Sequence, residues 1–262
     1  MHLTIGVTGH RDLVAAEVPV LREKVRDFFL QLKSDFPDLA LQLISPLAEG
    51  SDRLVADVAI DLGIELIVPL PMPQAEYEQD FSSPEAVEAF RATLKTARVI
   101  HLQTLTTPNG QAAATTDHER QYAQLGIFIS DHSQVLLALW DGKPSASIGG
   151  TSSVLNYHLT AVMPGYSVAE DSPNLLADNE NDLAFHIVCS RDRPGGQPNA
   201  DVQPLKTAWV TAHFGIESGS RMPLEYDVML HRLQDFGRDR KKYQAEIEAG
   251  GADLLEDALD LE

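Results

Sequence analysis

Three short turns of the sequence combine glycines with side chains that can bind an anion. Each turn follows an apolar run of the kind that forms a buried strand. The turns consist of Gly9, His10 and Arg11; of Ser45, Leu47, Ala48, Glu49, Gly50, Asp52 and Arg53; and of Asp141, Gly149, Gly150 and Thr151. Glycine allows close approach to the backbone, and cationic or N–H donors at such turns suit a phosphate or a carbonyl-rich ring. The sequence therefore predicts a pocket that accepts a phosphate.

Two of these turns lead directly into predicted helices. Residues 51–62 place apolar side chains at helical spacing, and a second helix is predicted over 151–162 after a glycine turn. The free N–H groups at the start of a helix bind anions, so both turns are candidate phosphate sites. Ser51 or Asp52 could equally be plain N-caps, and Gly9 could serve only as a turn.

The elements that must position these turns alternate between strand and helix. Strands are predicted at 3–9, 39–47, 64–70, 98–102, 134–140 and 186–190, and helices at 18–36, 51–62, 84–97, 117–130 and 151–162. This order predicts an α/β fold: a Rossmann-like, doubly wound, mainly parallel sheet with helices on both faces. Ligands of such sheets bind beyond the carboxyl ends of the strands, so the three turns should meet at one edge.

The chain divides into two predicted parts. Residues 1–200 are expected to form the Rossmann-like domain that holds the predicted pocket, and residues 201–262 a charged helical extension with an acidic tail. From Glu246 onward the sequence has seven carboxylates and no basic residue. That tail is either a solvated end or an interaction segment. The helix predicted over 224–247 could contact an effector partner or support a homo-oligomer.

Composition excludes several classes of function. The net charge of −19 argues against a binder of duplex nucleic acid, which would need a basic face. No apolar run approaches the roughly 18–20 residues that span a bilayer, and the first residues do not have the pattern of a signal peptide. The single cysteine, Cys189, rules out an internal disulfide and suits a reducing compartment, so a soluble, cytoplasmic protein is expected. The histidines do not have metal-ligand spacing, so no metal is predicted. No cofactor is assigned beyond a nucleotide-type ligand.

Three segments resemble the SLOG superfamily, which includes the Lonely Guy phosphoribohydrolases and the DprA-type DNA-processing proteins. Residues 5–11 (IGVTGHR) resemble its first-strand glycine motif, in the GxxGHR form of a sensor branch. Residues 45–53 (SPLAEGSDR) resemble its S-x-x-A-x-G-x-D segment, and Gly149 to Thr151 stand where the family has a glycine-rich phosphate loop. The resemblance covers about residues 3–190 and implies a Rossmann-like nucleotide-binding domain.

One position departs from the enzymes of that superfamily. Its phosphoribohydrolases carry G-G-x-G-T-x-x-E, in which the glutamate assists glycosidic cleavage, whereas Asn156 occupies the last place here. An amide cannot act as a general acid or base. The resemblance therefore favours a noncatalytic sensor or carrier of a nucleotide-derived, phosphate-bearing ligand. The alternative is a nucleotide phosphoribohydrolase or N-glycosidase of the Lonely Guy type that uses Glu49 or Glu119. Binding of single-stranded DNA in the DprA manner is disfavoured by the charge.

Overall fold

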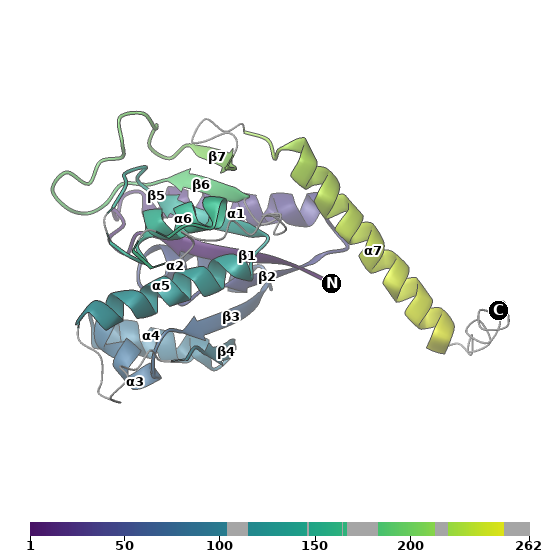
Figure 1. Ribbon diagram of the computed structural model, residues 1–262, viewed down its shortest axis with the longest axis horizontal. Helices are drawn as coiled ribbons and strands as arrows, with labels where there is room; N and C mark the ends of the chain where they lie inside the picture. The colour runs from purple at the N-terminus through teal and green to yellow at the C-terminus, as the bar shows by residue number, and fades with distance from the viewer. Residues whose placement is uncertain (104–114, 146, 164, 167–182, 213–219, 249–262) are drawn as a thin grey trace.

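The computed structural model describes residues 1–103, 115–145, 147–163, 165–166, 183–212 and 220–248. Within these ranges the chain forms a seven-stranded sheet with the order β4-β3-β2-β1-β5-β6-β7 (Figure 1). The strands are β1 (His2–Gly9), β2 (Ala40–Ile44), β3 (Glu65–Leu70), β4 (Arg98–His101), β5 (Val135–Trp140), β6 (Ala184–Val188) and β7 (Thr207–Val210). Neighbouring strands are parallel except for β6 and β7, which are antiparallel. The predicted α/β fold with a mainly parallel sheet is confirmed.

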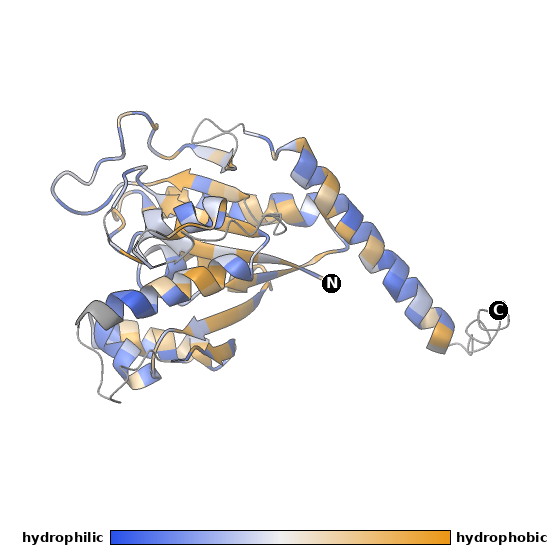
Figure 2. Cartoon of the chain, in the orientation of Figure 1, coloured by the Kyte–Doolittle hydropathy of each residue, from blue (hydrophilic) through white to orange (hydrophobic). Residues whose placement is uncertain are grey.

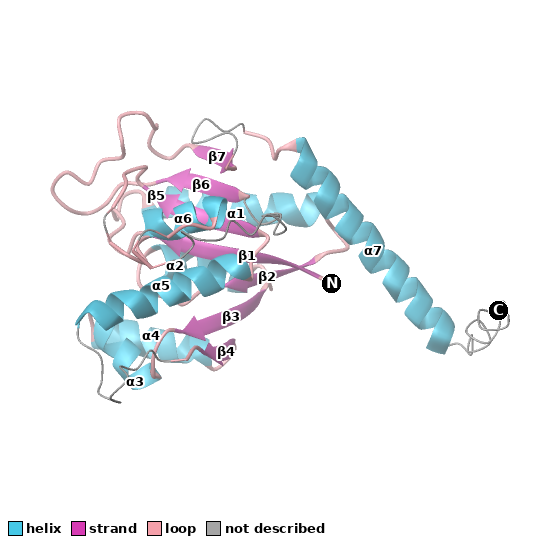
Figure 3. Ribbon diagram, viewed as in Figure 1, coloured by secondary structure: helices cyan, strands magenta, loops and turns pink. Residues whose placement is uncertain are grey.

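Helices alternate with the strands and cover both faces of the sheet (Figure 3). They are α1 (Val18–Asp35), α2 (Ser51–Asp61), α3 (Gln74–Tyr77), the short 3-10 helix η1 (Glu78–Asp80), α4 (Pro84–Leu94), α5 (Thr115–Asp131), α6 (Thr151–Thr160) and α7 (Leu224–Glu248). Side chains from α1, α2 and α4 join one hydrophobic core, and side chains from α5 and α6 join a second. The two cores lie on opposite faces of the sheet, as a doubly wound fold requires.

The central strand β5 is apolar throughout because both of its faces are buried (Figure 2). In β5 the side chains alternate between the two cores. Val135, Leu137 and Leu139 belong to the core with α1 and α2. Leu136, Ala138 and Trp140 belong to the core with α5 and α6. This double burial explains why the sequence of β5 shows a continuous apolar run rather than an alternating pattern.

Gly6 allows α5 to pack closely against β1. A Cβ atom at this position would lie 2.5 Å from Ser133 Oγ and 2.7 Å from Ile129 Cγ2, both of which are on or just after α5. These distances are too short for any larger residue without movement of the helix. The close packing fixes α5 over the centre of the sheet, next to the strand that ends at Gly9.

The chain order creates a crevice beside β1. From β1 the chain moves outward through β2, β3 and β4, and α5 then returns it to β5 on the other side of β1. The turns that follow β1 and β5 therefore lead to opposite faces of the sheet and diverge. The His10 N–H donates to the Leu139 carbonyl at 3.2 Å, so the two strands remain paired up to this point. Such a divergence is where open α/β sheets bind their ligands.

The sheet extends past the predicted boundary at residue 200. β7 lies in the stretch that the sequence assigned to a helical extension, yet it pairs with β6 as the edge strand. The predicted helix over 224–247 corresponds to α7, and the tail from residue 249 onward lies outside the described residues. Among the described residues, no helix is long and apolar enough to cross a membrane.

Candidate ligand-binding site

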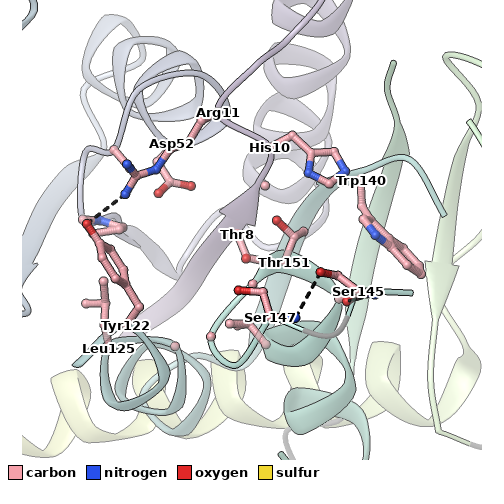
Figure 4. A pocket seen from close by; sticks show the side chains of 18 of the residues that line it. Thr8, His10, Arg11, Asp52, Tyr122, Leu125, Trp140, Ser145, Ser147 and Thr151 are labelled. Carbon is pink, nitrogen blue, oxygen red and sulfur yellow. Dashed lines mark hydrogen bonds between the residues drawn. The ribbon is translucent and has the colours of Figure 1, made fainter. Parts of the chain in front are cut away.

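A pocket of about 670 Å³ lies at the carboxyl edge of the sheet (Figure 4). Its walls come from the end of β1, from the residues that follow β1, β2, β3, β5 and β6, from one face of α5 and from the first turn of α6. The predicted ligand-binding residues that line it are Gly9, His10, Arg11, Ala48, Asp52, Asp141, Gly149, Gly150 and Thr151. The structure thus brings all three predicted turns to one cavity, although the turn after β2 contributes only part of its residues.

Three residues of the turn after β2 shape the pocket wall without lining it. Ser45 is fully buried, where its Oγ donates to the Asp52 carbonyl at 3.1 Å and accepts the Leu47 N–H at 3.2 Å. Leu47 is buried with a positive φ of 61°. Gly50 has a φ of 81°, and a Cβ there would lie 2.3 Å from the Arg11 carbonyl oxygen. These contacts fix the turn after β2 against the turn after β1.

The remaining two predicted residues of that turn contact helix starts outside the pocket. The Glu49 carboxylate accepts the Ser82 N–H at 2.9 Å and the Ser82 hydroxyl at 2.6 Å. Arg53 lies beside Asp57, with 3.9 Å between Nε and Oδ1, and its Nη1 reaches the Ala86 carbonyl at 3.5 Å. Both side chains hold the loop before α4 against α2.

The first turn of α6 provides an anion-binding wall. Thr151 begins the helix, Gly150 is its N-cap and Gly149 has a φ of 78°. A Cβ at Gly149 would lie 2.6 Å from the Ala123 backbone nitrogen, so only glycine permits this approach of the loop to α5. The Gly150 N–H donates to the Ser147 carbonyl at 3.2 Å and the Ser153 N–H to the Gly150 carbonyl at 2.9 Å, whereas the N–H groups of Thr151 and Ser152, at the first two helical positions, lack intrahelical partners and carry partial positive charge. They therefore suit a phosphate.

Serine side chains line the same wall. The Ser145 N–H donates to Ser152 Oγ at 3.0 Å, and the Ser147 N–H donates to Ser145 Oγ at 3.2 Å (Figure 4). Ser145, Ser147 and Ser152 all line the pocket, next to the glycines. These bonds order the loop before α6 and place hydroxyl groups close to the helix start.

A cation–aromatic cluster forms a second wall. Arg11 Nη2 donates to the Tyr122 hydroxyl at 2.9 Å, and its guanidinium carbon lies 5.2 Å from the centroid of that ring. The Tyr122 hydroxyl in turn donates to Asp80 Oδ2. His118 Nε2 lies 3.4 Å from the same carboxylate oxygen. This cluster joins residues from the end of β1, from η1 and from α5, and it holds the guanidinium at the pocket.

Tyr122, Asp80 and His118 were absent from the predicted site. Each helix that follows a strand begins at the carboxyl edge of the sheet, so α5 begins near the pocket, and its packing on β1 turns the face with Tyr122 toward the pocket. Tyr122 and His118 lie four residues apart on one face of that helix. The signal in the sequence was a tyrosine and a histidine at helical spacing in the first half of a predicted helix.

The Tyr122 hydroxyl should contribute measurably to folding stability. Tyr122→Phe removes the hydroxyl that links Arg11 to Asp80, so we expect the free energy of unfolding to fall by about 1–2 kcal/mol in chemical denaturation. Tyr157→Phe is the matched control, because its hydroxyl donates to Asp131 at 3.0 Å outside the pocket lining. We expect that control to lose at most about 0.5 kcal/mol. Equal losses for the two variants would contradict a structural role for the cluster.

Asp52 is a buried carboxyl on the pocket wall. Its side chain is 8% exposed, and Oδ1 has no hydrogen-bond partner among the described residues. Burial raises the pKa of Asp52 to about 7, and the nearby positive charge of Arg11 only partly offsets this. Asp52 is therefore close to half-protonated at neutral pH and offers either a donor or an acceptor to a ligand.

His10 and Asp141 form a buried pair at the switch point. His10 Nε2 lies 3.1 Å from Asp141 Oδ1 and accepts the Asp141 backbone N–H at 3.2 Å. Burial lowers the pKa of His10, although Asp141 opposes the shift. The pair fixes the turn after β1 against the turn after β5.

Cations after β5 and β6 line the far end of the pocket and were not predicted. Arg191 Nε lies 2.8 Å from Asp12 Oδ1, and Lys143 Nζ donates to the Gly195 carbonyl at 2.9 Å. Arg193 also lines the pocket and is exposed. The chain has a net charge of −19, yet the pocket carries positive side chains both at Arg11, after β1, and at Lys143, Arg191 and Arg193, after β5 and β6. For Arg191 and Arg193, the pattern that could have predicted them is the run Arg191-Asp192-Arg193 directly after a predicted strand.

The described residues contain no group of three or more His, Cys, Asp or Glu side chains placed to hold a metal ion. The fold and the pocket together define an α/β protein of Rossmann-like architecture with a polar crevice at the carboxyl edge of its sheet.

No protein-family model matches the chain, and no curated protein matches it.

Solved structures with similar folds include two DNA processing proteins. DNA processing protein A (DprA) from Streptococcus pneumoniae is 14% identical, with a TM-score of 0.35, over 52% of this chain and 41% of that one. The protein of the same name from Helicobacter pylori, described for its single-stranded DNA binding mode, is 12% identical, with a TM-score of 0.34, over 53% of this chain and 54% of that one. TM1055, a structural genomics target, is 13% identical, with a TM-score of 0.31, over 52% of this chain and 60% of that one. The matched regions span less than two thirds of each of these chains.

Proposed function

We propose that this chain binds a nucleotide-derived ligand through its phosphate and acts as a noncatalytic sensor or carrier module. The observation that carries the proposal is the first turn of α6, which lines the pocket with Gly149, Gly150 and Thr151. A helix start of this kind binds phosphate through backbone N–H groups and the helix dipole. The resemblance of three sequence segments to the SLOG superfamily supports the same class of ligand.

The rest of the pocket suits the remainder of a nucleotide. Its volume of about 670 Å³ lies within the range of small-molecule sites. The Tyr122 ring and the Arg11 guanidinium offer a surface for a base to stack on. Asp52 and the serine hydroxyls offer hydrogen bonds to ribose or to base edges. A nucleotide would thus have its phosphate at α6 and its base toward α5.

A thermal-shift panel tests this proposal. We would measure melting with nucleoside monophosphates, cyclic nucleotides, cyclic dinucleotides and NAD derivatives. A ligand at about 100 times its dissociation constant should raise stability by about 2.7 kcal/mol. Arg11→Ala should reduce that shift, because it removes the cation beside Tyr122. The proposal fails if no compound of the panel raises the melting temperature, or if Arg11→Ala leaves the ligand-induced rise in melting temperature unchanged.

A second candidate function rests on Glu119. This carboxylate lines the pocket and is exposed, whereas Glu49 is held by Ser82 outside the lining. The Asn156 amide also lies outside the lining, where it donates to the Val162 carbonyl at 2.7 Å. Glu119 is therefore the carboxylate that could act in a nucleotide N-glycosidase.

Incubation with AMP, IMP, CMP and NAD separates the two functions. A noncatalytic module predicts binding without release of free base over many hours. Steady base release that Glu119→Gln abolishes would favour the N-glycosidase instead. Glu49→Gln is the matched control, because its carboxylate is directed at Ser82.

A further inference from the structure

The second half of α7 carries an apolar stripe that the described part of the chain does not cover. Phe236, Tyr243 and Ile247 are 59%, 64% and 55% exposed, respectively. All residues of 241–247 are exposed, and the helix extends away from the sheet (Figure 1). By contrast, Tyr226 and Leu230 in the first half are buried against the body of the protein.

The projecting stretch lacks support from its own domain. Gln234 accepts the Asp38 N–H at 3.1 Å, and Arg238 Nε lies 3.7 Å from Asp38 Oδ2. Further along, Lys242 Nζ lies 4.0 Å from a Glu246 carboxylate oxygen on the same helix. The stretch after Arg238 continues the 25-residue helix α7, and its apolar side chains Tyr243 and Ile247 are exposed.

The spacing of the stripe is that of a coiled-coil seam. Its positions alternate by three and four residues: Tyr226, Met229, Leu233, Phe236, Arg240, Tyr243 and Ile247. The first three pack against the protein's own core. The last four continue the same seam and are exposed. The seam is thus occupied in its first half and open in its second.

We infer that the open half of α7 pairs with α7 of a second copy of this chain in an antiparallel arrangement. The seam is self-complementary in that orientation. Phe236 of one copy lies opposite Ile247 of the other, and Arg240 lies opposite the Tyr243 ring, where a guanidinium is attracted to the ring face. A two-fold axis repeats both contacts, as expected for a symmetric dimer.

Charge selects the antiparallel orientation. In a parallel pair, Arg240 would meet the same arginine of the copy within the seam, which places two like charges together. In the antiparallel pair, Arg240 faces Tyr243 of the copy instead, so the two guanidinium groups do not meet in the seam. Lys241 and Lys242 point away from the seam, because their positions lie more than a quarter turn from it on the helix.

The inference does not depend on the ligand. α7 packs next to Asp38, just before β2 begins, which is the opposite edge of the sheet from the pocket. A dimer formed through α7 therefore leaves the pocket open in both copies. A negative result for the dimer therefore does not contradict the proposed ligand site, and a negative result for the ligand does not contradict the dimer.

Sedimentation velocity of the full chain at about 1 to 100 µM tests the association. We expect a reversible dimer, and we expect Phe236→Asp or Tyr243→Asp to raise its dissociation constant roughly 100-fold, because each change occurs twice in a symmetric pair. Leu224→Asp is the matched control, since Leu224 is 75% exposed and lies off the seam. That variant should keep the dissociation constant within about twofold. Far-ultraviolet circular dichroism of each variant at low concentration checks that its domain remains folded.

Disulfide trapping tests the orientation. An equimolar mixture of Arg240→Cys and Tyr243→Cys should cross-link under oxidation, whereas Tyr243→Cys alone should not. The native Cys189 is buried and gives no background. A monomer over the whole concentration range would overturn the inference, as would a dimer insensitive to Phe236→Asp. Cross-linking of Tyr243→Cys alone would show a parallel pair and would also overturn it.

Discussion

Gly150→Asp is expected to abolish binding of a phosphate-bearing ligand while leaving the domain folded. Gly150 has an ordinary φ of −73°, and a Cβ there would lie 3.3 Å from Ser147 Cβ, so a side chain fits with a small adjustment. Aspartate is also a favourable N-cap and suits the helix dipole. Its carboxylate, however, would occupy the place of the phosphate. Two like charges at about 4 Å repel by about 4 kcal/mol at an effective dielectric of 20, which is close to a thousandfold in affinity.

Gly150→Asn is the matched control for this prediction. It has the same size and also caps helices, but it is neutral. We expect it to retain affinity within about tenfold in calorimetric titration with the ligand found by the panel. Both variants should melt at or above the temperature of the parent chain. Full binding by Gly150→Asp would show that the phosphate lies elsewhere.

Asp52→Asn should stabilise the protein at alkaline pH. The pKa of Asp52 is raised from 3.8 to about 7 in the folded state, mainly by burial. Between these two values the folded state binds the proton more tightly than the unfolded chain, so stability falls as pH rises through that window. Above pH 7 the buried carboxylate is fully charged, which lowers the free energy of unfolding by roughly 2–4 kcal/mol. An asparagine of the same shape does not carry this cost.

Urea denaturation at several pH values measures the effect. We expect the free energy of unfolding of Asp52→Asn to exceed that of the parent chain by roughly 2–4 kcal/mol at pH 8 and to be nearly equal to it near pH 4. Asp61→Asn is the control, because Asp61 is 61% exposed on the same helix. Its stability should follow that of the parent at every pH. A constant difference between Asp52→Asn and the parent from pH 4 to pH 8 would contradict a raised pKa.

The sheet and the meeting of two turns at its edge could be predicted from the sequence. Continuous apolar runs such as that of β5 occur where both faces of a strand are buried. The carboxyl ends of parallel strands share one edge, so the turns that follow β1 and β5 were expected at one cavity, and Gly9 and Gly149 both line it. This inference needs only the order of the elements and not their packing.

The side chains that complete the pocket could not be predicted as readily. Tyr122 reaches the pocket because α5 packs closely on Gly6, and that distance depends on the tertiary fold. Asp80 comes from η1, a short element without a hydrophobic period. Arg191 depends on how the chain turns after β6. In each case the site residue lies on an element whose position is set by packing rather than by strand order.

In the turn after β2, the sequence predicted site residues that do not line the pocket. Its residues gave the most specific motif in the sequence, yet Ser45 and Leu47 are buried within the turn and Glu49 binds Ser82. A motif reports that a backbone shape is required, and it does not distinguish side chains that hold the shape from those that face the cavity. Only Ala48 and Asp52 of the predicted residues in this turn line the pocket.

Amide hydrogen exchange with and without the nucleotide selected by the thermal panel tests the central claim most directly. A phosphate bound by the N–H groups of Thr151 and Ser152 should slow exchange across residues 147–153 and at residues 9–12 across the pocket. Exchange in the projecting half of α7 should not change and serves as the internal reference. Protection confined to another surface, with no change at 147–153, would contradict the account of this pocket as a nucleotide site.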